Sequence, residues 1–360
     1  MGKRNNKMKM PLRILLILLC AAMILIIPFT VSSPNLLNDV KMELMNDGED
    51  EIDFGKLFFP GAMAEDLPEE EVEEEELDGE KPAEGAFEAH PEWVLPFDFT
   101  VPPAPDAALY TEDSYEDETI RVKMEKQEMD DGTKMYVAYI QIADPCQLRT
   151  GVANPEKTSS TRTKTVKAMA KYYNAVIAIN GDNYVDNPQK TTFEFRMTKA
   201  IRSKTNKTKD ILVIDDLGNF RLFVKSQGIK ELPDQLKKEG RSIINAFTFG
   251  PALVKDGVLL ELDENYGYNP NGREPRTAIG QMGPLSYVMV IIQPKDRSGN
   301  TGFSQRKLAE FMYNLGCVQA FNLDGGNSAE MVFGDQVIKG QPGADDRTLS
   351  DIVYFATMQP

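Results

Sequence analysis

Charged residues divide this chain into three segments of very different character. Residues 33–117 contain 27 aspartates and glutamates against three lysines. Dense like charge with few large apolar side chains cannot bury enough surface to offset the entropy of the chain. The composition therefore predicts an acidic, disordered tether over residues 33–117, with any folded domain beginning at residue 118.

The first 32 residues predict a segment that targets the membrane. They carry five basic residues and no acids, and residues 14–31 form an uncharged, mostly apolar run of 18 residues. As a helix this run would span about 27 Å, close to the hydrocarbon thickness of a bilayer. The basic flank favours a cytoplasmic N-terminus. We therefore expect a single-pass anchor in the cell membrane with an extracytoplasmic C-terminal domain; cleavage as a signal peptide, followed by secretion, is the alternative.

Residues 118–360 carry the remaining 29 acids and 32 bases and predict one folded domain. A domain of this length buries about 70–75% of the surface of its unfolded chain. Apolar residues alternate at residues 120–126 and 135–142, and an amphipathic helix is indicated between Ser304 and Gly316. Many strands, few helices and hairpin turns predict an α+β fold with a mixed, largely antiparallel sheet core and a few packed helices.

Several classes of chemistry are excluded by residues that the domain lacks. The only histidine, His90, lies in the acidic segment, so the domain has no Ser-His-Asp or Cys-His arrangement and no histidine metal ligand. Cys146 and Cys317 are too few for a four-cysteine zinc site; they either form one disulfide or are two buried thiols. There is no P-loop and no strand–GxGxxG–helix unit, and charge is nearly balanced, so neither a nucleotide nor a nucleic acid is expected as a partner.

Polar residues cluster in four stretches at the ends of predicted strands, where a packed core can fix side chains toward a common rim. Carboxylates and amides follow a buried strand in "AINGDNY", and arginine forks suited to phosphate occur in "GREPRTAIG" and "DDRTLSD". In "FNLDGGNS", adjacent glycines allow close backbone approach and an anion-binding nest of N–H groups. The candidate site residues are Asn180, Asp182, Asn183, Arg276, Thr277, Asp324, Gly325, Gly326, Asn327, Ser328 and Arg347.

The order of these stretches resembles the phosphodiester glycosidase family. "AINGDNY", "FGPALVKDG", "RTAIG", "NLDGGNSAEM" and an arginine before the last strand follow one another, and the similarity runs from about residue 120 to the C-terminus. The resemblance implies hydrolysis of a sugar-1-phosphodiester to free sugar and a phosphomonoester. Matching positions in this chain include Asn180, Asp182, Arg276, Thr277, Asp324, Gly325, Gly326 and Ser328. Asn327 stands where the family commonly has a third glycine, and Ala329 where it has a second hydroxyl, which puts substrate identity in question.

The chemistry implied by the resemblance is compatible with a domain without histidine. A phosphomonoester has a second pKa near 6 and leaves without a strong general acid. Arg276, Arg347 and the amides of Gly325–Gly326 suit the phosphate, and Asp182 or Asp324 suits the anomeric carbon. No cofactor is then required, and the expected substrate is a phosphorylated glycan or cell-envelope polymer.

Two other functions use the same residues. Asp182, Asp324 and the nearby asparagines also suit Mg²⁺ or Ca²⁺ in a metal-dependent phosphodiesterase. The altered loop at Asn327 and Ala329 also suits a tethered glycan-binding domain without catalysis.

Overall fold

The computed structural model describes residues 97–158, 160–188 and 191–359. The segment 1–32 predicted to target the membrane, and most of the predicted tether, lie outside these ranges. None of the helices in the described ranges is long and apolar enough to cross a membrane.

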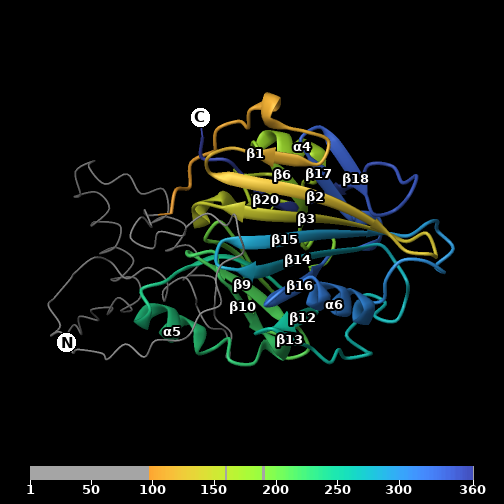
Figure 1. The fold of residues 1–360 in the computed structure, drawn as a ribbon. Helices are drawn as coiled ribbons and strands as arrows, with labels where there is room; N and C mark the ends of the chain where they lie inside the picture. Colours follow the sequence, from red (N-terminus) through yellow and green to blue (C-terminus); the bar gives the residue numbers. More distant parts are fainter. Residues whose placement is uncertain (1–96, 159, 189–190, 360) are drawn as a thin grey trace, which may run out of the picture. The chain divides into compact units, whose positions relative to one another are not determined.

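Three sheets form the body of the domain (Figure 1). The eight-stranded sheet has the order β1 (Ser114–Glu116), β2 (Ile120–Glu128), β3 (Lys134–Ile142), β15 (Ser286–Gln293), β14 (Arg276–Gly283), β16 (Gln319–Leu323), β12 (Ala252–Lys255), β13 (Val258–Leu259). One five-stranded sheet has the order β10 (Phe220–Phe223), β9 (Ile211–Asp215), β11 (Ile243–Phe247), β7 (Phe193–Arg196), β8 (Lys199–Ser203). The other has the order β18 (Gln336–Lys339), β17 (Glu330–Phe333), β6 (Ile177–Asn180), β20 (Asp351–Phe355), β4 (Leu148–Val152).

The remaining elements are short. β5 (Lys164–Thr165) pairs with β19 (Thr348–Leu349), and the helices of the described residues are α4 (Val166–Tyr172), α5 (Leu232–Lys238) and α6 (Gln305–Asn314). The described residues also form four 3-10 turns: η2 (Ala107–Leu109), η3 (Pro145–Gln147), η4 (Val224–Ser226) and η5 (Gly326–Ser328). All strand pairs in the described residues are antiparallel. The predicted α+β class is confirmed, with sheets that are antiparallel rather than mixed.

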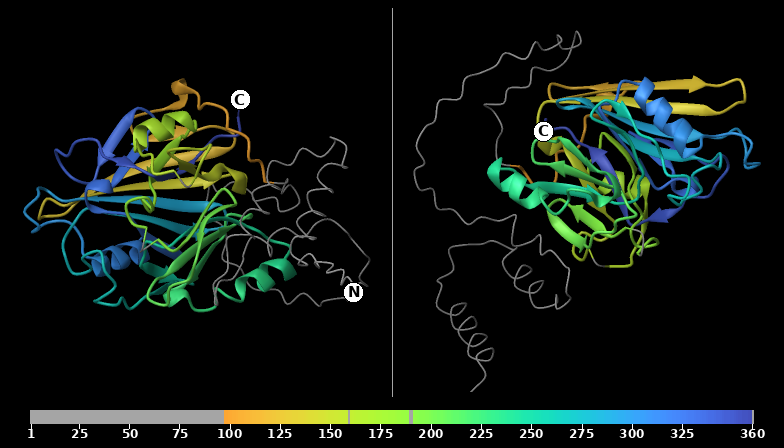
Figure 2. Two further views of the ribbon diagram at one scale, coloured as in Figure 1. Left: turned by 180° about the vertical axis from the view of Figure 1, so that it is seen from behind. Right: turned by 90° about the horizontal axis from the view of Figure 1, so that it is seen from below.

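The largest hydrophobic core lies where the inner faces of the three sheets meet. Met289 and Ile291 of β15, Ile179 of β6 and Leu212 of β9 all contribute to it. The outer face of each sheet has a core of its own with one helix: α6 covers the eight-stranded sheet, α5 the sheet of β9 and α4 the sheet of β6. Figure 1 shows α6 beside β12 and β16, and the view from behind in Figure 2 shows α4 over its sheet. Strands buried on both faces explain continuous apolar runs such as that of β15.

Helix α6 follows directly from its sequence. The Ser304 hydroxyl accepts a hydrogen bond from the Lys307 N–H (3.2 Å), which satisfies one of the free donors of the first turn. Leu308 and Met312, one turn apart, are fully buried against the sheet. Gly316 follows the helix with φ +87°, a conformation that glycine adopts at little cost.

The folded domain begins before the predicted boundary at residue 118. Strand β1 pairs with β2, and Tyr115 within β1 is 1% exposed in the central core. Composition missed this strand because residues 112–117 are rich in acids, most of which flank the strand, while Glu116 lies at its exposed end. Cys146 and Cys317 are both buried and free, so they do not form a disulfide.

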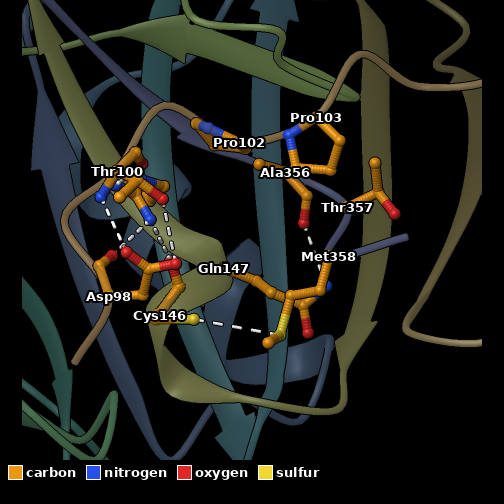
Figure 3. Close-up of a pocket in the computed structure, with 10 residues that line it drawn as sticks. Asp98, Thr100, Pro102, Pro103, Cys146, Gln147, Ala356, Thr357 and Met358 are labelled. Carbon is orange, nitrogen blue, oxygen red and sulfur yellow. Dashed lines mark hydrogen bonds between the residues drawn. The ribbon is translucent and has the colours of Figure 1, made fainter. Parts of the chain in front are cut away.

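A buried arginine fastens residues 98–102 to the domain. Arg149 on β4, 5% exposed, donates from Nη1 to the Asp98 carbonyl (2.8 Å) and from Nη2 to the Thr100 carbonyl (2.7 Å). Asn174 Nδ2 donates to the Pro102 carbonyl (2.8 Å). Figure 3 shows Asp98 and Thr100 of this segment, which line a pocket together with Cys146 and Met358.

Arg149→Ala is expected to lower the free energy of unfolding by about 2–3 kcal/mol, because the charge-assisted hydrogen bonds of a buried guanidinium are lost. Urea unfolding measures the change. Arg121→Ala is the matched control, since Arg121 pairs with Glu116 at the surface of the domain, an interaction worth at most about 1 kcal/mol. Equal losses in the two variants would contradict the proposed role of Arg149.

Candidate active site

Polar side chains from all three sheets converge at one edge of the domain. Asn180 ends β6, Asp324 follows β16, and Asp351 begins β20. Glu194 and Arg196 come from β7, in the third sheet. The site is therefore built at the junction of three separately packed sheets, and each sheet supplies part of it.

Asn180 connects the strands that carry the two candidate carboxylates. Its Oδ1 accepts hydrogen bonds from Thr277 Oγ1 (2.9 Å) and the Glu330 N–H (3.2 Å), and its Nδ2 donates to the Asp324 carbonyl (2.6 Å). The side chain is fully buried. Because its amide is used by the protein itself, Asn180 and Thr277 position the site rather than contact a ligand.

Four fully buried charged residues lie beneath the turn that follows β6: Asp182, Glu194, Arg196 and Asp351. Arg196 Nη2 lies 2.8 Å from both Glu194 Oε2 and Asp351 Oδ2, and 3.8 Å from Asp182 Oδ2. Three carboxylates thus share one guanidinium. Its Nη1 donates to the carbonyls of Phe195 and Ala246, so every edge of the guanidinium is engaged.

Burial raises the pKa of two of these carboxyls, which favours their protonated form. Desolvation, followed by the charge of Glu194, raises the pKa of Asp182 well above its usual range. Desolvation also raises the pKa of Glu194, against the opposing effect of Arg196. Asp182 Oδ2 also accepts the N–H groups of Thr248 (2.8 Å) and Phe249 (3.3 Å).

Asp351 holds the turn that carries Asp182. Its Oδ1 accepts the Asn183 N–H (2.9 Å) and its Oδ2 the Asp182 N–H (3.3 Å). A Cβ added at Gly181 would lie 2.1 Å from Asp351 Oδ2, so the close approach requires glycine at this position. The "NGDN" sequence is therefore a turn wrapped around a buried carboxylate.

Asp324 is the most exposed of the buried carboxylates in the site. It is 9% exposed, and it interacts with the side chains of Ser328 and Asn183. Desolvation raises the pKa of Asp324 to about 7, and the charge of Asp182 adds to the rise, while Ser328 and Arg347 oppose it. A carboxyl that titrates near neutral pH is suited to exchange a proton with a substrate or a water.

Arg347 brings a solvent-accessible cation to the same place. Its side chain is 42% exposed, and Nη1 donates to Ser328 Oγ (2.8 Å) while Nη2 pairs with Asp186 Oδ2 (3.2 Å). Ser328 thus links Arg347 to Asp324. In the described residues, no three carboxylate, histidine or cysteine side chains are placed to hold a metal ion.

Comparison with known proteins gives this arrangement a family. A family model described as phosphodiester glycosidase matches residues 173–356, about half of the chain. The chain belongs to the phosphodiester glycosidase family. All the side chains of the converging cluster, from Asn180 to Asp351, lie within the matched residues.

The fold is shared with a solved member of this family. The catalytic domain of zebrafish N-acetylglucosamine-1-phosphodiester alpha-N-acetylglucosaminidase, auto-inhibited by its pro-peptide, has a TM-score of 0.50 at 16% identity, covering 66% of this chain and 83% of that one. A hypothetical protein from Synechocystis has a TM-score of 0.47 at 15% identity, with 66% and 62% covered. YomE, an SPbeta prophage-derived uncharacterized protein of Bacillus subtilis, is 25% identical over 201 residues, 55% of this chain but 30% of YomE. This chain therefore matches less than a third of that relative.

Arg276 has a different place in this phosphodiester glycosidase from the one predicted. It is 2% exposed, and its guanidinium donates to the carbonyls of Phe303, Tyr268, Asn269 and Gly272 at 2.8–3.1 Å. Desolvation lowers its pKa. The guanidinium is occupied by backbone oxygens, so the predicted phosphate contact is wrong for this conformation. Arg276 instead anchors the loop that stacks Tyr268 on Phe249, with ring centroids 3.8 Å apart.

The loop at Gly325 and Gly326 does not form the predicted anion-binding nest of free N–H groups. The Gly326 N–H donates to the Pro275 carbonyl (2.9 Å), so it is not free to bind an anion, while Gly325 precedes it as the cap of η5. The left-handed residue is Gly326 (φ +57°), and Asn327 is an exposed residue of η5. Ala329 packs in the central core, so its missing hydroxyl changes packing rather than a ligand contact.

The structure brings most of the predicted residues together and adds three that the sequence reading missed. Asn180, Asp182, Asn183, Asp324, Ser328 and Arg347 are linked by the contacts above. Glu194, Arg196 and Asp351 were missed. The available signal was "FEFR": two charges at alternate positions of a buried strand lie on the same face and need partners inside the protein.

Proposed function

We propose that this phosphodiester glycosidase hydrolyses a sugar-1-phosphodiester to free sugar and a phosphomonoester. The observation that carries the proposal is the pairing of Asp324, a buried carboxyl with a pKa of about 7, with the exposed cation Arg347 through Ser328. A substrate of this class needs a carboxylate at the anomeric carbon and a cation at the phosphate. The site offers the carboxylate of Asp324 and the guanidinium of Arg347, connected through the Ser328 hydroxyl.

Asp324 is assigned to the reacting carbon. In its ionised form it either attacks the anomeric carbon or takes a proton from an attacking water. The bond from the anomeric carbon to the bridging oxygen breaks, and its electron pair leaves with the phosphate oxygen. The phosphomonoester is stable as an anion near neutral pH, so its departure needs no histidine.

Asp182 is assigned a positioning role, because it has no exposed surface. It lies beneath the site beside Glu194, and with Asp324 it forms a pair of carboxyls whose environments differ. The charge of Asp182 contributes to the raised pKa of Asp324. Asp351 and Arg196 keep Asp182 in place through the turn described above.

The phosphate is assigned to Arg347 and Ser328, at the exposed side of the site. Arg347 presents a planar guanidinium that matches phosphate oxygens. The Ser328 hydroxyl lies 2.8 Å from Nη1 of this guanidinium. Exposed Asn327 and the turn at Asn183 border the same place. We propose a phosphorylated glycan or cell-envelope polymer as the substrate, reached outside the membrane by a domain on the predicted anchor and tether.

We also propose that the reaction needs no divalent cation. The support is Arg196, which already supplies the positive charge among Asp182, Glu194 and Asp351. Activity that survives treatment with EDTA is the expected result. Loss of activity on chelation, with recovery on adding Mg²⁺ or Ca²⁺, would overturn it.

Product analysis with a sugar-1-phosphodiester tests the proposed reaction. Free sugar and a phosphomonoester are expected. Sugar phosphate plus an alcohol would mean P–O cleavage by a phosphodiesterase, and binding without turnover would mean a glycan-binding domain. Either outcome would overturn the glycosidase.

Arg347→Ala is expected to lower kcat/KM about 10- to 100-fold, because charge-assisted hydrogen bonds to the phosphate are worth about 1.5–3 kcal/mol. Steady-state kinetics on the same substrate measure the loss. Arg297→Ala is the matched control: Arg297 is exposed and donates to the carbonyls of Pro342 and Gly343 in the segment that precedes Arg347. A similar loss in both variants would remove Arg347 from the phosphate site.

A further inference from the structure

An ion pair at the rim of the site involves the cation assigned to the phosphate. Asp186 Oδ2 lies 3.2 Å from Arg347 Nη2, and the two side chains are 47% and 42% exposed. Asn183 Nδ2 donates to the same Asp186 oxygen (3.1 Å). The turn that follows β6 therefore holds a negative charge directly against Arg347.

This carboxylate has no part in the reaction described above, yet it changes the charge of the phosphate subsite. Arg347 alone would give the rim a charge of +1, and Asp186 brings the pair to zero. Tight phosphate binding would be served better without it. Its position therefore points to selection among phosphates rather than to affinity.

We propose that Asp186 makes this subsite favour the singly charged phosphodiester substrate over the more highly charged phosphomonoester product. The proposal rests on the proposed function, which defines substrate and product. Before cleavage the phosphate carries one negative charge. When the bond to the anomeric carbon breaks, its electron pair stays on the phosphate oxygen, and the product carries about −1.5 to −2 near neutral pH.

The selection follows from the dependence of repulsion on ligand charge. The electrostatic free energy between Asp186 and a bound phosphate scales with the charge of the phosphate. The free-energy penalty on a dianion is therefore twice that on a monoanion. Because affinity depends exponentially on free energy, the factor by which the affinity for the dianion falls is the square of the factor for the monoanion. For exposed groups screened by water and salt, we expect about a twofold effect on the monoanion and about a fourfold effect on the dianion.

Two small phosphates test this charge rule without any turnover. Dimethyl phosphate is a monoanion, and methyl phosphate is a dianion above its second pKa of about 6. Neither contains a glycosidic bond, so calorimetric titration of the full chain reports binding alone. Asp186→Asn keeps the shape of the side chain and its contact with Asn183 but removes the charge.

Asp186→Asn is expected to bind methyl phosphate about fourfold more tightly and dimethyl phosphate about twofold more tightly than the unmodified chain. The gain should shrink at high salt. Asp345→Asn is the matched control, because it removes an exposed carboxylate two residues before Arg347. The control is expected to leave the ratio of the two affinities unchanged.

Three results would overturn the proposal: an unchanged ratio in Asp186→Asn, an equal change in Asp345→Asn, or no binding of either probe by the unmodified chain. Failure of the proposed function looks different. A chain that binds both probes with the expected ratios but releases no sugar supports the charge rule at the subsite while overturning the glycosidase. An active glycosidase with an unchanged ratio overturns only the role of Asp186.

Discussion

Asp324→Asn is expected to abolish turnover and at the same time to stabilise the protein by about 2–4 kcal/mol at neutral to alkaline pH. Burial raises the pKa of Asp324 from 3.8 to about 7. The folded state therefore binds a proton more tightly than the unfolded state does between these two values. Asparagine has the same shape and carries no charge, so it removes both the reactive group and the cost of burying it.

The sign of the pH dependence follows from the raised pKa. Below about pH 4 the carboxyl is protonated in both states and costs nothing. As pH rises toward about 7, the unfolded state ionises first and the folded state loses stability; above about 7 the loss is complete. Asp324→Asn should therefore match the unmodified chain near pH 4 and exceed it near pH 8.

Urea unfolding at the two pH values measures the difference, with Asp335→Asn as the control. Asp335 is an exposed carboxylate in the turn between β17 and β18. Its variant is expected to follow the unmodified chain within about 0.5 kcal/mol. A pH dependence of Asp324→Asn that is identical to that of the unmodified chain would show that Asp324 is not the titrating group.

Arg196→Met is expected to lower the free energy of unfolding by about 3–5 kcal/mol near neutral pH, which leaves the chain partly unfolded. The substitution removes the one guanidinium that Asp182, Glu194 and Asp351 share in a fully buried place. Breaking a buried ion pair by removing one partner leaves uncompensated charge, and this costs more than the pair itself contributes.

Acid should partly rescue Arg196→Met. Arg196 lowers the pKa values of Asp182 and Glu194, so without it both carboxyls hold their protons to a higher pH. Stability is then greatest where they are protonated and falls as pH rises through their folded pKa values. We expect a smaller deficit near pH 5 than near pH 8, measured by urea unfolding.

Arg202→Met is the matched control for this prediction. Arg202 lies on the neighbouring strand β8, is partly buried, and donates to the carbonyls of Tyr184 and Thr191. It is therefore an arginine of similar surroundings outside the carboxylate cluster. Equal deficits in the two variants, or a deficit of Arg196→Met that does not change with pH, would contradict the charge argument.

The sequence predicted those parts of the fold in which one pattern dominates. Strand β3 contains the predicted residues 135–142, because apolar residues at alternate positions of a short run favour a half-buried strand. Helix α6 is recognisable from the serine that caps it and the spacing of Leu308 and Met312. The sequence did not predict strand β1, because the acidic residues around it resemble those of the tether. Its pairing with β2 is what distinguishes this strand from the tether.

The site was predictable in its turns and not in its buried charges. Asp182 and Asp324 were found because polar residues crowd the ends of apolar strands. Glu194 and Arg196 belong to a strand that the apolar pattern of the sequence did not indicate. One of the partners of Arg196, Asp351, lies more than 150 positions further along the chain. The error at Arg276 has the same origin: whether a guanidinium faces a ligand or backbone carbonyls depends on the path of a loop, which periodicity does not encode.

The position of β20 in its sheet has a consequence for when activity can arise. This strand lies between β6 and β4, although both were made about 170 to 200 residues earlier. The two earlier strands therefore cannot complete their sheet until β20 has been translated. Pairing between strands so far apart in the sequence slows folding. Asp351 arrives with that strand and completes the support of Asp182. A chain emerging from the ribosome therefore lacks this support of Asp182 until its residues beyond 350 have followed, so we expect the proposed activity to begin only when the whole domain has been made.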